Sequence, residues 1–229
     1  KQTVMIAGGA EELSATQAAV FDVLFATSCR HDEPHKTPRP YDKGRDGLVI
    51  GEGSACLILE EYEHAVARGA RIYAELVGYG SNTDGMHVTQ PNRDTMAGCM
   101  RLSLADADLQ ADAIHYINGH GTATEQGDIA ESQATMEVMG GNIPLSSLKS
   151  YFGHTLGACG AIEAMLAIKM MQTQTFIANL NLEQIDPECA PLNFIQGEAQ
   201  HFRAEYIMSN NFAFGGINTS LIFRNPQAS

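Results

Sequence analysis

Positive charge and long apolar runs are both scarce in this sequence. Its 229 residues include 14 lysines and arginines against 27 aspartates and glutamates, which gives a formal net charge of −13. Because no Lys/Arg-rich run occurs, we expect no nucleic-acid partner, and the acidic balance argues against docking on an anionic membrane. The longest apolar segment, Gly157 to Met171, is interrupted by Glu163 and Lys169, so it falls short of the roughly 18 uninterrupted residues of a membrane span. We therefore expect a globular protein with no membrane partner.

Cysteine is also scarce, and its pattern argues against two common frameworks. The cysteines are far apart, odd in number and form no C-x-x-C pair, so neither a disulfide framework nor a structural zinc site is expected. No secretory leader precedes the first motif, and we expect a reducing, cytoplasmic location. A reactive thiolate needs a helix N-terminus or a cationic neighbour, and no cysteine clearly has one. The five are Cys29, Cys56, Cys99, Cys159 and Cys189.

The order of the expected helices and strands predicts the fold class. The chain begins with a short buried strand over Thr3–Ala10 that ends in a glycine turn, and residues 60–68 are expected to form a helix that stops at Gly69. From about residue 93 helices and strands alternate, which is typical of an α/β layered fold around a central sheet. The later elements are helices at about 94–106, 126–139 and 157–172, and strands at about 114–118, 144–147, 205–208 and 219–223.

Two histidines beside glycines are the first candidates for catalysis. His120 lies in the segment Asn118–Thr124, just after a predicted strand, and His154 lies in Leu148–Gly157. A glycine neighbour lets the backbone present an imidazole into a cleft, and the carboxyl ends of strands carry the chemistry of α/β sheets. For a single histidine, a structural hydrogen bond in a turn is the better interpretation. Two such segments favour a site that needs two imidazoles.

Polar residues near the histidines have both structural and functional interpretations. Glu163 lies one turn into an apolar helix, and a buried carboxylate is costly unless it is paired, so Lys149 is its expected partner. Thr122 and Thr124 could cap the following helix, because Thr122 to Glu125 spells a capping box. They could equally donate hydrogen bonds to a polar ligand, and the two roles are compatible.

Two glycine-rich turns are also ambiguous. The segment Phe212–Gly216 separates two predicted strands, and a tight hairpin with two core aromatic rings is its structural interpretation. As a functional element it could supply a backbone N–H to an oxyanion, with a phenyl ring as a gate. The segment Asp42–Gly53 does not have the spacing of an EF-hand calcium loop. We interpret it as a structural turn in which Arg45 pairs with Asp46 or Glu52.

Taken together, these segments resemble the β-ketoacyl-acyl-carrier-protein synthases, the elongating condensing enzymes of fatty acid and polyketide synthesis. The matches occur in order and run over essentially the whole chain, which argues against chance similarity. The matching segments are Met5–Glu11, Tyr41–Gly53 with Leu57–Glu61, Asn118–Thr124, Lys149–Ala158 and Ser209–Asn218.

The resemblance implies a fold and a missing part. The family has the thiolase fold, in which two similar α/β halves stack into a five-layer αβαβα sandwich, usually as a homodimer. Residues 1–80 would end the N-terminal half and residues 81–229 would form the C-terminal half, so most of the first half would be lacking. The family's nucleophilic cysteine opens a helix just before the strand that Val4–Ala7 represents. This chain begins after that position, and we expect the fragment alone to be inactive.

The resemblance also implies a role for each candidate residue. His120 and His154 would hold the malonyl thioester carbonyl and stabilise the enolate, with Lys149 nearby. The Phe214 backbone N–H would complete an oxyanion hole, with its ring as the gate. The other implied residues are Thr122 and Thr124 at the phosphopantetheine arm, Phe212 and Gly215 in the substrate-binding turn, Glu163 in an ion pair with Lys149, and Asn118, Glu163, Ser209 and Asn210 around a monovalent cation found in some members.

Partners and substrates follow from the same resemblance. No cofactor is expected, because the substrates arrive on the phosphopantetheine of acyl carrier protein, and that protein is the expected partner beside a homodimer or heterodimer mate. Acyl chain length, saturation and pathway stay open, since Ser14–Ser28, which lines the acyl pocket in relatives, is bulky here. Carrier protein is acidic like this chain, so any docking patch must be local. The candidates for it are Arg30, Lys36 and Arg39.

Three alternative functions remain at this stage. One is a non-catalytic partner subunit similar to the chain-length factors, although retention of both His120 and His154 argues against it. A second is a structural half-domain that only completes the fold of another subunit. A third, a degradative thiolase, lacks support because no late cysteine stands beside a glycine run near the C-terminus. A cysteine that opens a helix shortly before Lys1 in the complete gene would favour the enzyme.

Overall fold

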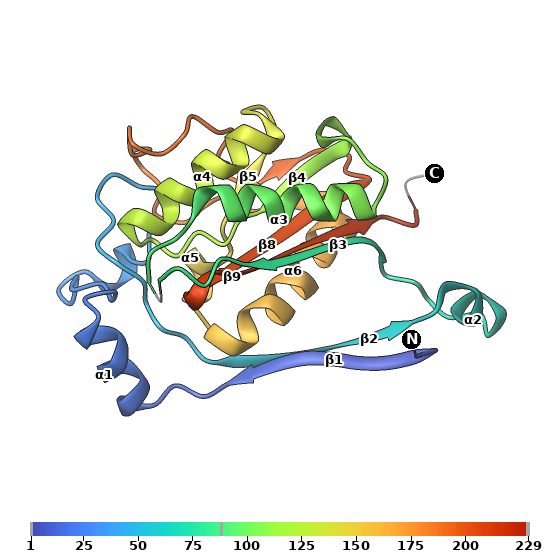
Figure 1. The fold of residues 1–229 in the computed structure, drawn as a ribbon, viewed down its shortest axis with the longest axis horizontal. Helices are drawn as coiled ribbons and strands as arrows, with labels where there is room; N and C mark the ends of the chain where they lie inside the picture. The colour runs from blue at the N-terminus through green and yellow to red at the C-terminus, as the bar shows by residue number, and fades with distance from the viewer. Residues whose placement is uncertain (1, 88, 228–229) are drawn as a thin grey trace.

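A mixed five-stranded sheet forms the centre of the computed structural model, which describes residues 2–87 and 89–227 (Figure 1). In sheet order its strands are β3 (Glu75–Thr83), β9 (Ile217–Arg224), β8 (Tyr206–Ala213), β4 (Ile114–Asn118) and β5 (Leu145–Ser146). The strand β4 is parallel to both of its neighbours, whereas β9 is antiparallel to β8 and to β3.

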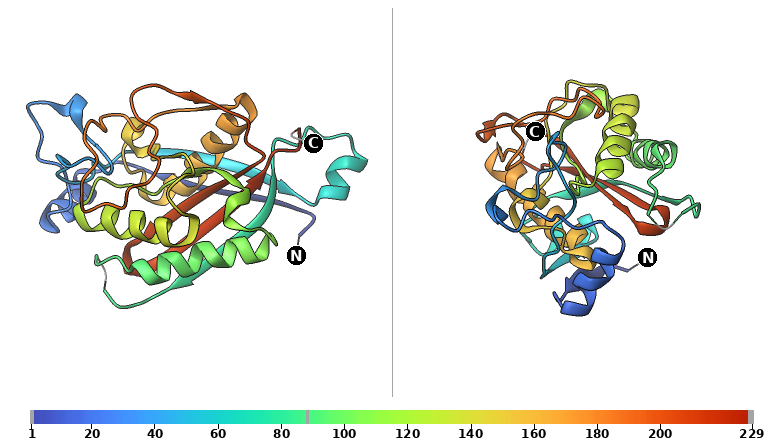
Figure 2. Two further views of the ribbon diagram at one scale, coloured as in Figure 1. Left: turned by 90° about the horizontal axis from the view of Figure 1, so that it is seen from above. Right: turned by 90° about the vertical axis from the view of Figure 1, so that its left-hand side faces the viewer.

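Helices cover both faces of this sheet. The helices α3 (Arg93–Asp106) and α4 (Glu125–Met139) lie on one face, and α6 (Cys159–Thr173) lies on the other (Figures 1 and 2). A two-stranded antiparallel sheet of β1 (Val4–Glu11) and β2 (Gly53–Glu60) packs on the far side of α6. The layers therefore follow the order αβαβ, and the predicted α/β layered fold around a central sheet is confirmed.

The core consists of two apolar clusters, one on each face of the central sheet. On β4, Tyr116 belongs to the cluster against α6, and Ile117 to the cluster against α3 and α4. The same alternation separates Ile207 from Met208 on β8. Successive side chains of a strand point to opposite faces, so a strand covered on both sides is apolar throughout. This explains why the adjacent pairs Tyr116–Ile117 on β4 and Ile207–Met208 on β8 are apolar on both faces.

The prediction of a buried first strand is wrong, although the strand itself is present. In β1, the side chains of Val4 and Ile6 are 48% and 73% exposed, and Ile58 on β2 is 71% exposed. On the inner face, Gly9 lies so close to the start of α6 that an added Cβ would stand 2.2 Å from the Gly157 carbonyl oxygen. Within the described residues, no helix or strand covers the outer face of this two-stranded sheet.

The predicted later elements lie within a few residues of the helices α2, α3, α4 and α6 and of the strands β4, β5, β8 and β9. The final hairpin strands are longer than expected, because the pairing of β8 with β9 continues to Ala213 and Ile217. Among the described residues, no helix is long and apolar enough to cross a membrane. The remaining elements are α1 (Ala15–Val23), α2 (Tyr62–Ala67), α5 (Lys149–Phe152), β6 (Thr175–Phe176), β7 (Gln200–His201) and the 3-10 turns η1 (Pro34–Lys36), η2 (Ala111–Ala113), η3 (Leu156–Ala158) and η4 (Phe214–Gly216).

The parallel strands β4, β5 and β8 end at one edge of the sheet. The loop after β4 carries His120, the segment after β5 leads directly to Lys149, and β8 ends in the hairpin turn at Phe214. Three segments far apart in sequence therefore meet where polar side chains collect in α/β proteins.

Candidate active site

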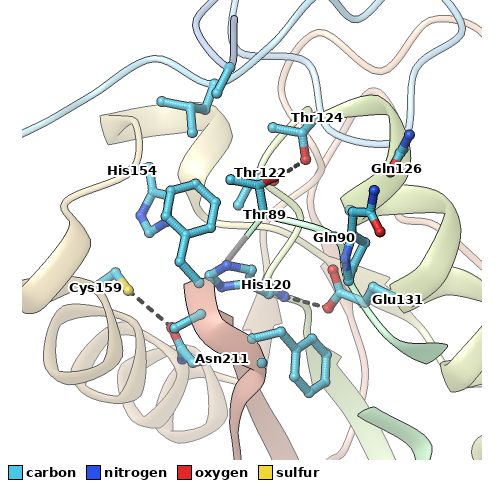
Figure 3. A pocket seen from close by; sticks show the side chains of 18 of the residues that line it. Thr89, Gln90, His120, Thr122, Thr124, Gln126, Glu131, His154, Cys159 and Asn211 are labelled. Carbon is cyan, nitrogen blue, oxygen red and sulfur yellow. Dashed lines mark hydrogen bonds between the residues drawn. The ribbon is translucent and has the colours of Figure 1, made fainter. Parts of the chain in front are cut away.

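A cavity of about 840 Å³ opens at this edge of the sheet (Figure 3). The two histidines enter it from separate loops, and the hairpin after β8 forms another part of its wall. Lys149 and Glu163 are fully buried behind the histidines. The predicted site residues that line the cavity are His120, Thr122, Thr124, His154, Phe212 and Phe214.

The loop that carries His120 is fixed by carboxylates from α4. Glu131 accepts hydrogen bonds from the backbone N–H of His120 at 2.6 Å, from that of Gly121 at 2.7 Å and from the Tyr41 hydroxyl at 3.0 Å. Gly121 has φ +31°, and an added Cβ would stand 2.6 Å from the Ser147 Cβ. A glycine is therefore required next to the histidine, as its place in the sequence indicated.

The second histidine is held by the backbone of the Asp42–Gly53 segment. The His154 N–H donates to the Val49 carbonyl at 2.7 Å, and the Gly51 N–H donates to the His154 carbonyl at 3.0 Å. Gly153 precedes it with φ +76°, a conformation that favours glycine. These contacts place the two rings 5.2 Å apart between centroids, with an interplanar angle of 86°.

The hydrogen bonds around the two rings assign their tautomers. The Lys149 ammonium can only donate, so the contact of 3.1 Å between Lys149 Nζ and His120 Nδ1 makes that nitrogen an acceptor. The Leu156 backbone N–H donates to His154 Nδ1 at 3.2 Å. In a neutral imidazole the other nitrogen then carries the proton. Both histidines therefore keep an Nε2–H as a donor.

Burial keeps both imidazoles neutral. Burial holds the pKa of His120 well below its usual value of 6.5, and the nearby Lys149 and His154 lower it further. The pKa of His154 is lowered for the same two reasons, burial first and Lys149 second. A neutral imidazole donates a hydrogen bond without carrying a net charge. Two such donors can therefore share a small cavity without mutual repulsion.

The predicted pairing of Lys149 with Glu163 is present. Lys149 Nζ lies 2.5 Å from Glu163 Oε1, and both side chains are almost completely buried. Burial raises the pKa of the Glu163 carboxyl, and Lys149 is the strongest influence that opposes this. The ion pair makes the buried carboxylate tolerable, and it directs the ammonium toward His120.

The predicted capping box from Thr122 to Glu125 does not form. Thr124 is the N-cap of α4, but its side chain makes no capping hydrogen bond. The two threonine hydroxyls instead contact each other at 2.8 Å within the cavity. Asp128 accepts from the backbone N–H of Thr122 and Ala123 in their place, and a buried carboxylate has more acceptor capacity than a hydroxyl.

The hairpin after β8 forms the aromatic wall of the cavity. The Phe212 ring lies 6.2 Å from the His120 ring, whereas Phe214 is 42% exposed and stacks on Phe21 at 5.5 Å. Gly215 has φ +76°, which allows the tight turn between the strands. The Phe214 side chain is thus held at the mouth by a residue of α1.

The residues proposed around a cation contain unsatisfied buried oxygens. Asn118 Nδ2 donates to Ser209 Oγ at 3.2 Å and lies 3.5 Å from Glu163 Oε2. Asn118 Oδ1 and both polar side-chain atoms of Asn210 are buried without a hydrogen-bond partner. Unpartnered buried oxygens are costly, and amide and carboxylate oxygens suit a hard cation. The four residues therefore fit a small monovalent cation.

The expected ion pair of Arg45 is wrong. Arg45 does not pair with Asp46 or Glu52: its guanidinium contacts Asp186 at 2.5 Å and Asp128 at 3.5 Å. Arg45 joins two distant segments because it is buried and needs several acceptors.

Arg39 is unsuited to a docking patch. It is only 5% exposed and forms an ion pair with Asp42. Lys36, another docking candidate, pairs with Glu33 on the surface.

Glu131, Asp128 and Asn211 are the contributors that the sequence did not reveal. All three line or support the cavity. The spacing of Asp128 and Glu131 on α4 was the one available signal, since residues three apart share a helix face.

We predict that Glu131→Ala lowers the free energy of unfolding by about 3 kcal/mol or more, because it leaves several buried donors unpaired at about 1–3 kcal/mol each. Urea unfolding of the full-length protein measures this. The matched control is Glu137→Ala on the same helix, whose partners Arg93 and Arg101 are exposed, with an expected cost below about 1 kcal/mol. Equal effects of the two substitutions would contradict the assigned role.

Comparisons with known proteins agree with this geometry. Two families match the chain: Beta-ketoacyl synthase, N-terminal domain, over residues 1–65, and Beta-ketoacyl synthase, C-terminal domain, over residues 73–183. The 3-oxoacyl-[acyl-carrier-protein] synthase 1 of Haemophilus influenzae is 43% identical over 226 residues, covering 98% of this chain and 55% of that protein. The synthase 2 of Coxiella burnetii is 42% identical over 225 residues, with coverages of 95% and 54%. The chain thus spans about half the length of these relatives.

Solved structures give the same result. A beta-ketoacyl synthase from Burkholderia phymatum is 64% identical and aligns with a TM-score of 0.98, over 99% of this chain and 56% of that one. A type II polyketide ketosynthase, solved in complex with its acyl-carrier protein, aligns with a TM-score of 0.93 at 36% identity, over 97% of this chain and 56% of that one. With both of its domain families matched in order along one thiolase-like fold, the chain belongs to the beta-ketoacyl synthase family.

Proposed function

We propose that this chain is the histidine-bearing part of a 3-oxoacyl-[acyl-carrier-protein] synthase, which condenses malonyl-carrier protein with an acyl-enzyme and releases carbon dioxide. One observation carries the proposal: His120 and His154 present two neutral Nε2–H donors to one cavity. Preorganised hydrogen-bond donors aimed at developing negative charge make the largest single contribution to the rate enhancement of many enzymes. The names of the relatives support this activity.

In the proposed reaction, the two imidazoles hold the thioester oxygen of the malonyl group. The bond between its Cα and carboxylate breaks, carbon dioxide leaves, and the electron pair forms an enolate on that oxygen. The enolate carbon then attacks the acyl thioester of a cysteine supplied by a segment before Lys1, and the cysteine thiolate leaves. The oxyanion that forms in this second step accepts a hydrogen bond from the Phe214 backbone N–H. Neutral donors suit both steps, because they strengthen as negative charge develops.

The other residues support the two donors. Lys149 holds His120 in the Nε2–H tautomer, and Glu163 holds Lys149. Thr122 and Thr124 offer hydroxyls at the cavity wall to the phosphopantetheine arm, and Phe212 with Gly215 shapes the turn that closes it. Asn118, Glu163, Ser209 and Asn210 would hold a monovalent cation, which would coordinate the unpartnered side-chain oxygens of Asn118 and Asn210.

A cation at these four residues predicts salt-specific stability. Replacing potassium and sodium by tetramethylammonium at constant ionic strength is expected to lower the melting temperature, because a bound ligand stabilises only the folded state. The Asn210→Leu variant should lose this difference between salts. An identical melting temperature of the unaltered protein in all three salts would contradict the cation site.

The division into halves belongs to the same proposal. Residues 1–80 would close the N-terminal thiolase-like half, and residues 81–229 would form the C-terminal half, with β3 crossing the boundary. The exposed apolar face of β1 and β2 supports the proposal that another segment of the N-terminal half packs on it.

The proposed partner is acyl carrier protein, and the proposed location is the cytoplasm, in a homodimer or heterodimer. One solved relative is a complex of a ketosynthase with its acyl-carrier protein, and another pairs a ketosynthase with a chain length factor. Five free cysteines are compatible with a reducing compartment. One relative is described as mitochondrial.

The test is condensation by the full-length protein with acyl-carrier proteins of graded chain length and malonyl-carrier protein. We expect carbon dioxide release and a 3-oxoacyl product, with a chain-length optimum. A protein that does neither, alone or with a partner subunit, would exclude the enzyme. Activity that appears only with a separate catalytic subunit would favour the chain-length-factor alternative.

A further inference from the structure

Tyr41 is a buried tyrosine that meets the His120 loop from a distant segment of the chain. Its side chain is completely buried, and its ring packs on Phe194 with 4.5 Å between the ring centroids. The Tyr41 hydroxyl donates to Glu131 Oε2 at 3.0 Å. Tyr41 does not itself line the cavity, so it can act on the site only through the groups that it contacts.

The backbone of Tyr41 adopts a conformation that tyrosine rarely takes. Its φ of +63° lies in the left-handed region, which costs free energy for a residue with a Cβ. The Tyr41 N–H donates to Asp128 Oδ2 at 2.7 Å, and the Tyr41 carbonyl accepts from the Asp186 N–H at 2.9 Å. Strained residues persist where the surrounding structure over-determines them, and they gather at functional sites. Main-chain contacts and ring packing together fix the position of the Tyr41 hydroxyl.

The Tyr41 hydroxyl lies beside both of the glycines that flank His120. A Cβ added to Gly119 would stand 2.5 Å from the hydroxyl oxygen, and a Cβ added to Gly121 would stand 2.8 Å from it. Both distances are far shorter than the separation of about 3.5–4.0 Å at which non-bonded heavy atoms pack best. The two glycines therefore leave the space that the hydroxyl needs to reach Glu131.

We propose that Tyr41 is a positioning residue whose hydroxyl fixes the Glu131 carboxylate and, through it, the main chain that carries His120. Glu131 Oε1 accepts a hydrogen bond from the His120 N–H at 2.6 Å (Figure 3). Glu131 Oε2 accepts from the Gly121 N–H at 2.7 Å and from the Tyr41 hydroxyl at 3.0 Å. The carboxylate has one orientation that keeps all three hydrogen bonds. The role rests on the proposed function, in which His120 donates to the substrate.

A small displacement of the His120 loop would matter to the chemistry. The proposed reaction needs two imidazoles that reach one thioester oxygen, and their ring centroids lie 5.2 Å apart. A misplacement of about 1 Å caused by a distant substitution can cost about 100-fold in rate. Because Tyr41 lies outside the cavity wall, its loss should change the rate of the chemical step more than substrate binding.

The first test is Tyr41→Phe in the full-length protein, which removes the hydroxyl and keeps the ring against Phe194. We expect kcat for malonyl decarboxylation to fall roughly tenfold, with a change in KM below about twofold. Amide hydrogen exchange, followed by mass spectrometry, should become faster in the peptide that contains His120 and Gly121, because their shared acceptor is held less firmly.

The matched control is Tyr116→Phe. Tyr116 is also completely buried, and its hydroxyl contacts Ser146 Oγ at 2.7 Å, so the control measures the general cost of removing a buried hydroxyl. It should leave both kcat and the exchange of the His120 peptide unchanged. An unchanged kcat or an unchanged exchange in Tyr41→Phe would overturn the proposal, and so would equal effects of the two substitutions.

A second substitution separates the hydrogen bond of Tyr41 from its packing. Gly119→Ala should lower the melting temperature by about 5 °C, because its Cβ meets the Tyr41 hydroxyl. Without that hydroxyl the next-nearest atoms stand 3.3 Å away, so the double variant with Tyr41→Phe should recover most of this loss. Its kcat should stay as low as that of Tyr41→Phe alone, since the donor is still missing.

Gly121→Ala provides the contrast for this double variant. Its Cβ would stand 2.6 Å from the Ser147 Cβ, and its φ is +31°, so Tyr41→Phe should not restore its melting temperature. Two results would overturn the role of the hydroxyl. One is a return of kcat when Gly119→Ala is added to Tyr41→Phe, and the other is a simple sum of the two losses in melting temperature.

The exchange and melting measurements separate this proposal from the proposed function, because neither requires activity. If the unaltered protein releases no carbon dioxide, the proposed function fails, and faster exchange in Tyr41→Phe still shows that Tyr41 holds the His120 loop. If the unaltered protein is active and Tyr41→Phe has the same kcat, the proposed function stands and the positioning role of Tyr41 is overturned.

Discussion

Replacing His120 by alanine in the full-length protein is expected to abolish decarboxylation of malonyl-carrier protein, with a loss in kcat of about 10²–10³ or more. That range is the cost of removing one donor from an oxyanion site. His154→Ala should have an effect of the same size, because the two Nε2–H groups face one cavity with their rings 5.2 Å apart. The measurement is carbon dioxide release at saturating malonyl-carrier protein.

The double variant and a control sharpen this prediction. Residues that act as a unit are not additive, so the double alanine variant should lose little more than either single variant. His201→Ala changes an exposed histidine on β7 and should retain full activity. Circular dichroism must show that the alanine variants are folded. Full activity in either folded single variant would refute the role of that histidine and remove the main support for the proposed function.

Lys149→Met is expected to remove activity and also to lower the free energy of unfolding by about 3–5 kcal/mol. The stability loss follows because Glu163 stays buried without its ammonium partner, 2.5 Å away in the native structure. The activity loss has a separate cause, since His120 Nδ1 loses the donor that fixes its tautomer. Chemical denaturation measures the first effect and malonyl decarboxylation the second.

A second substitution separates these two effects. Adding Glu163→Gln to Lys149→Met removes the uncompensated charge, so most of the stability should return, because replacing a whole buried pair is often nearly neutral. Activity should not return. For comparison, Arg101→Ala breaks the exposed pair with Glu137 and should cost less than about 1 kcal/mol. If activity recovers along with stability in the double variant, the role of Lys149 is structural only.

The local patterns of the sequence predicted most of the elements and the two main candidates. Strand–helix alternation gave β4 and α4 to within one or two residues, since both have strong periodicity and clear ends. The cost of a buried carboxylate was enough to pair Glu163 with Lys149 before any contact was known. The short elements α5, β6 and β7 were missed because two to four residues carry no periodicity.

Burial and capping were harder to predict. The apolar residues of β1 indicated a buried strand, but burial depends on what packs against both faces, and the outer face of this one is exposed. Thr122 and Glu125 matched a capping box, but Asp128 is a stronger acceptor and lies within reach of the same backbone groups. A local motif fails where a distant or better group competes for the same hydrogen bonds.

The layered fold class, the resemblance to condensing enzymes and the two glycine-flanked histidines could be predicted from the sequence, because each rests on residue types and local spacings that are read directly along the chain. The packing of distant segments fixes what surrounds the His120 imidazole: Glu131 beneath its loop, Lys149 at its Nδ1 and His154 beside its ring. These groups lie 11 to 34 residues from His120, and only the strand order and register bring them together. Spacing along the chain carries no information about which nitrogen of a ring will meet a donor, whereas the packed structure fixes it.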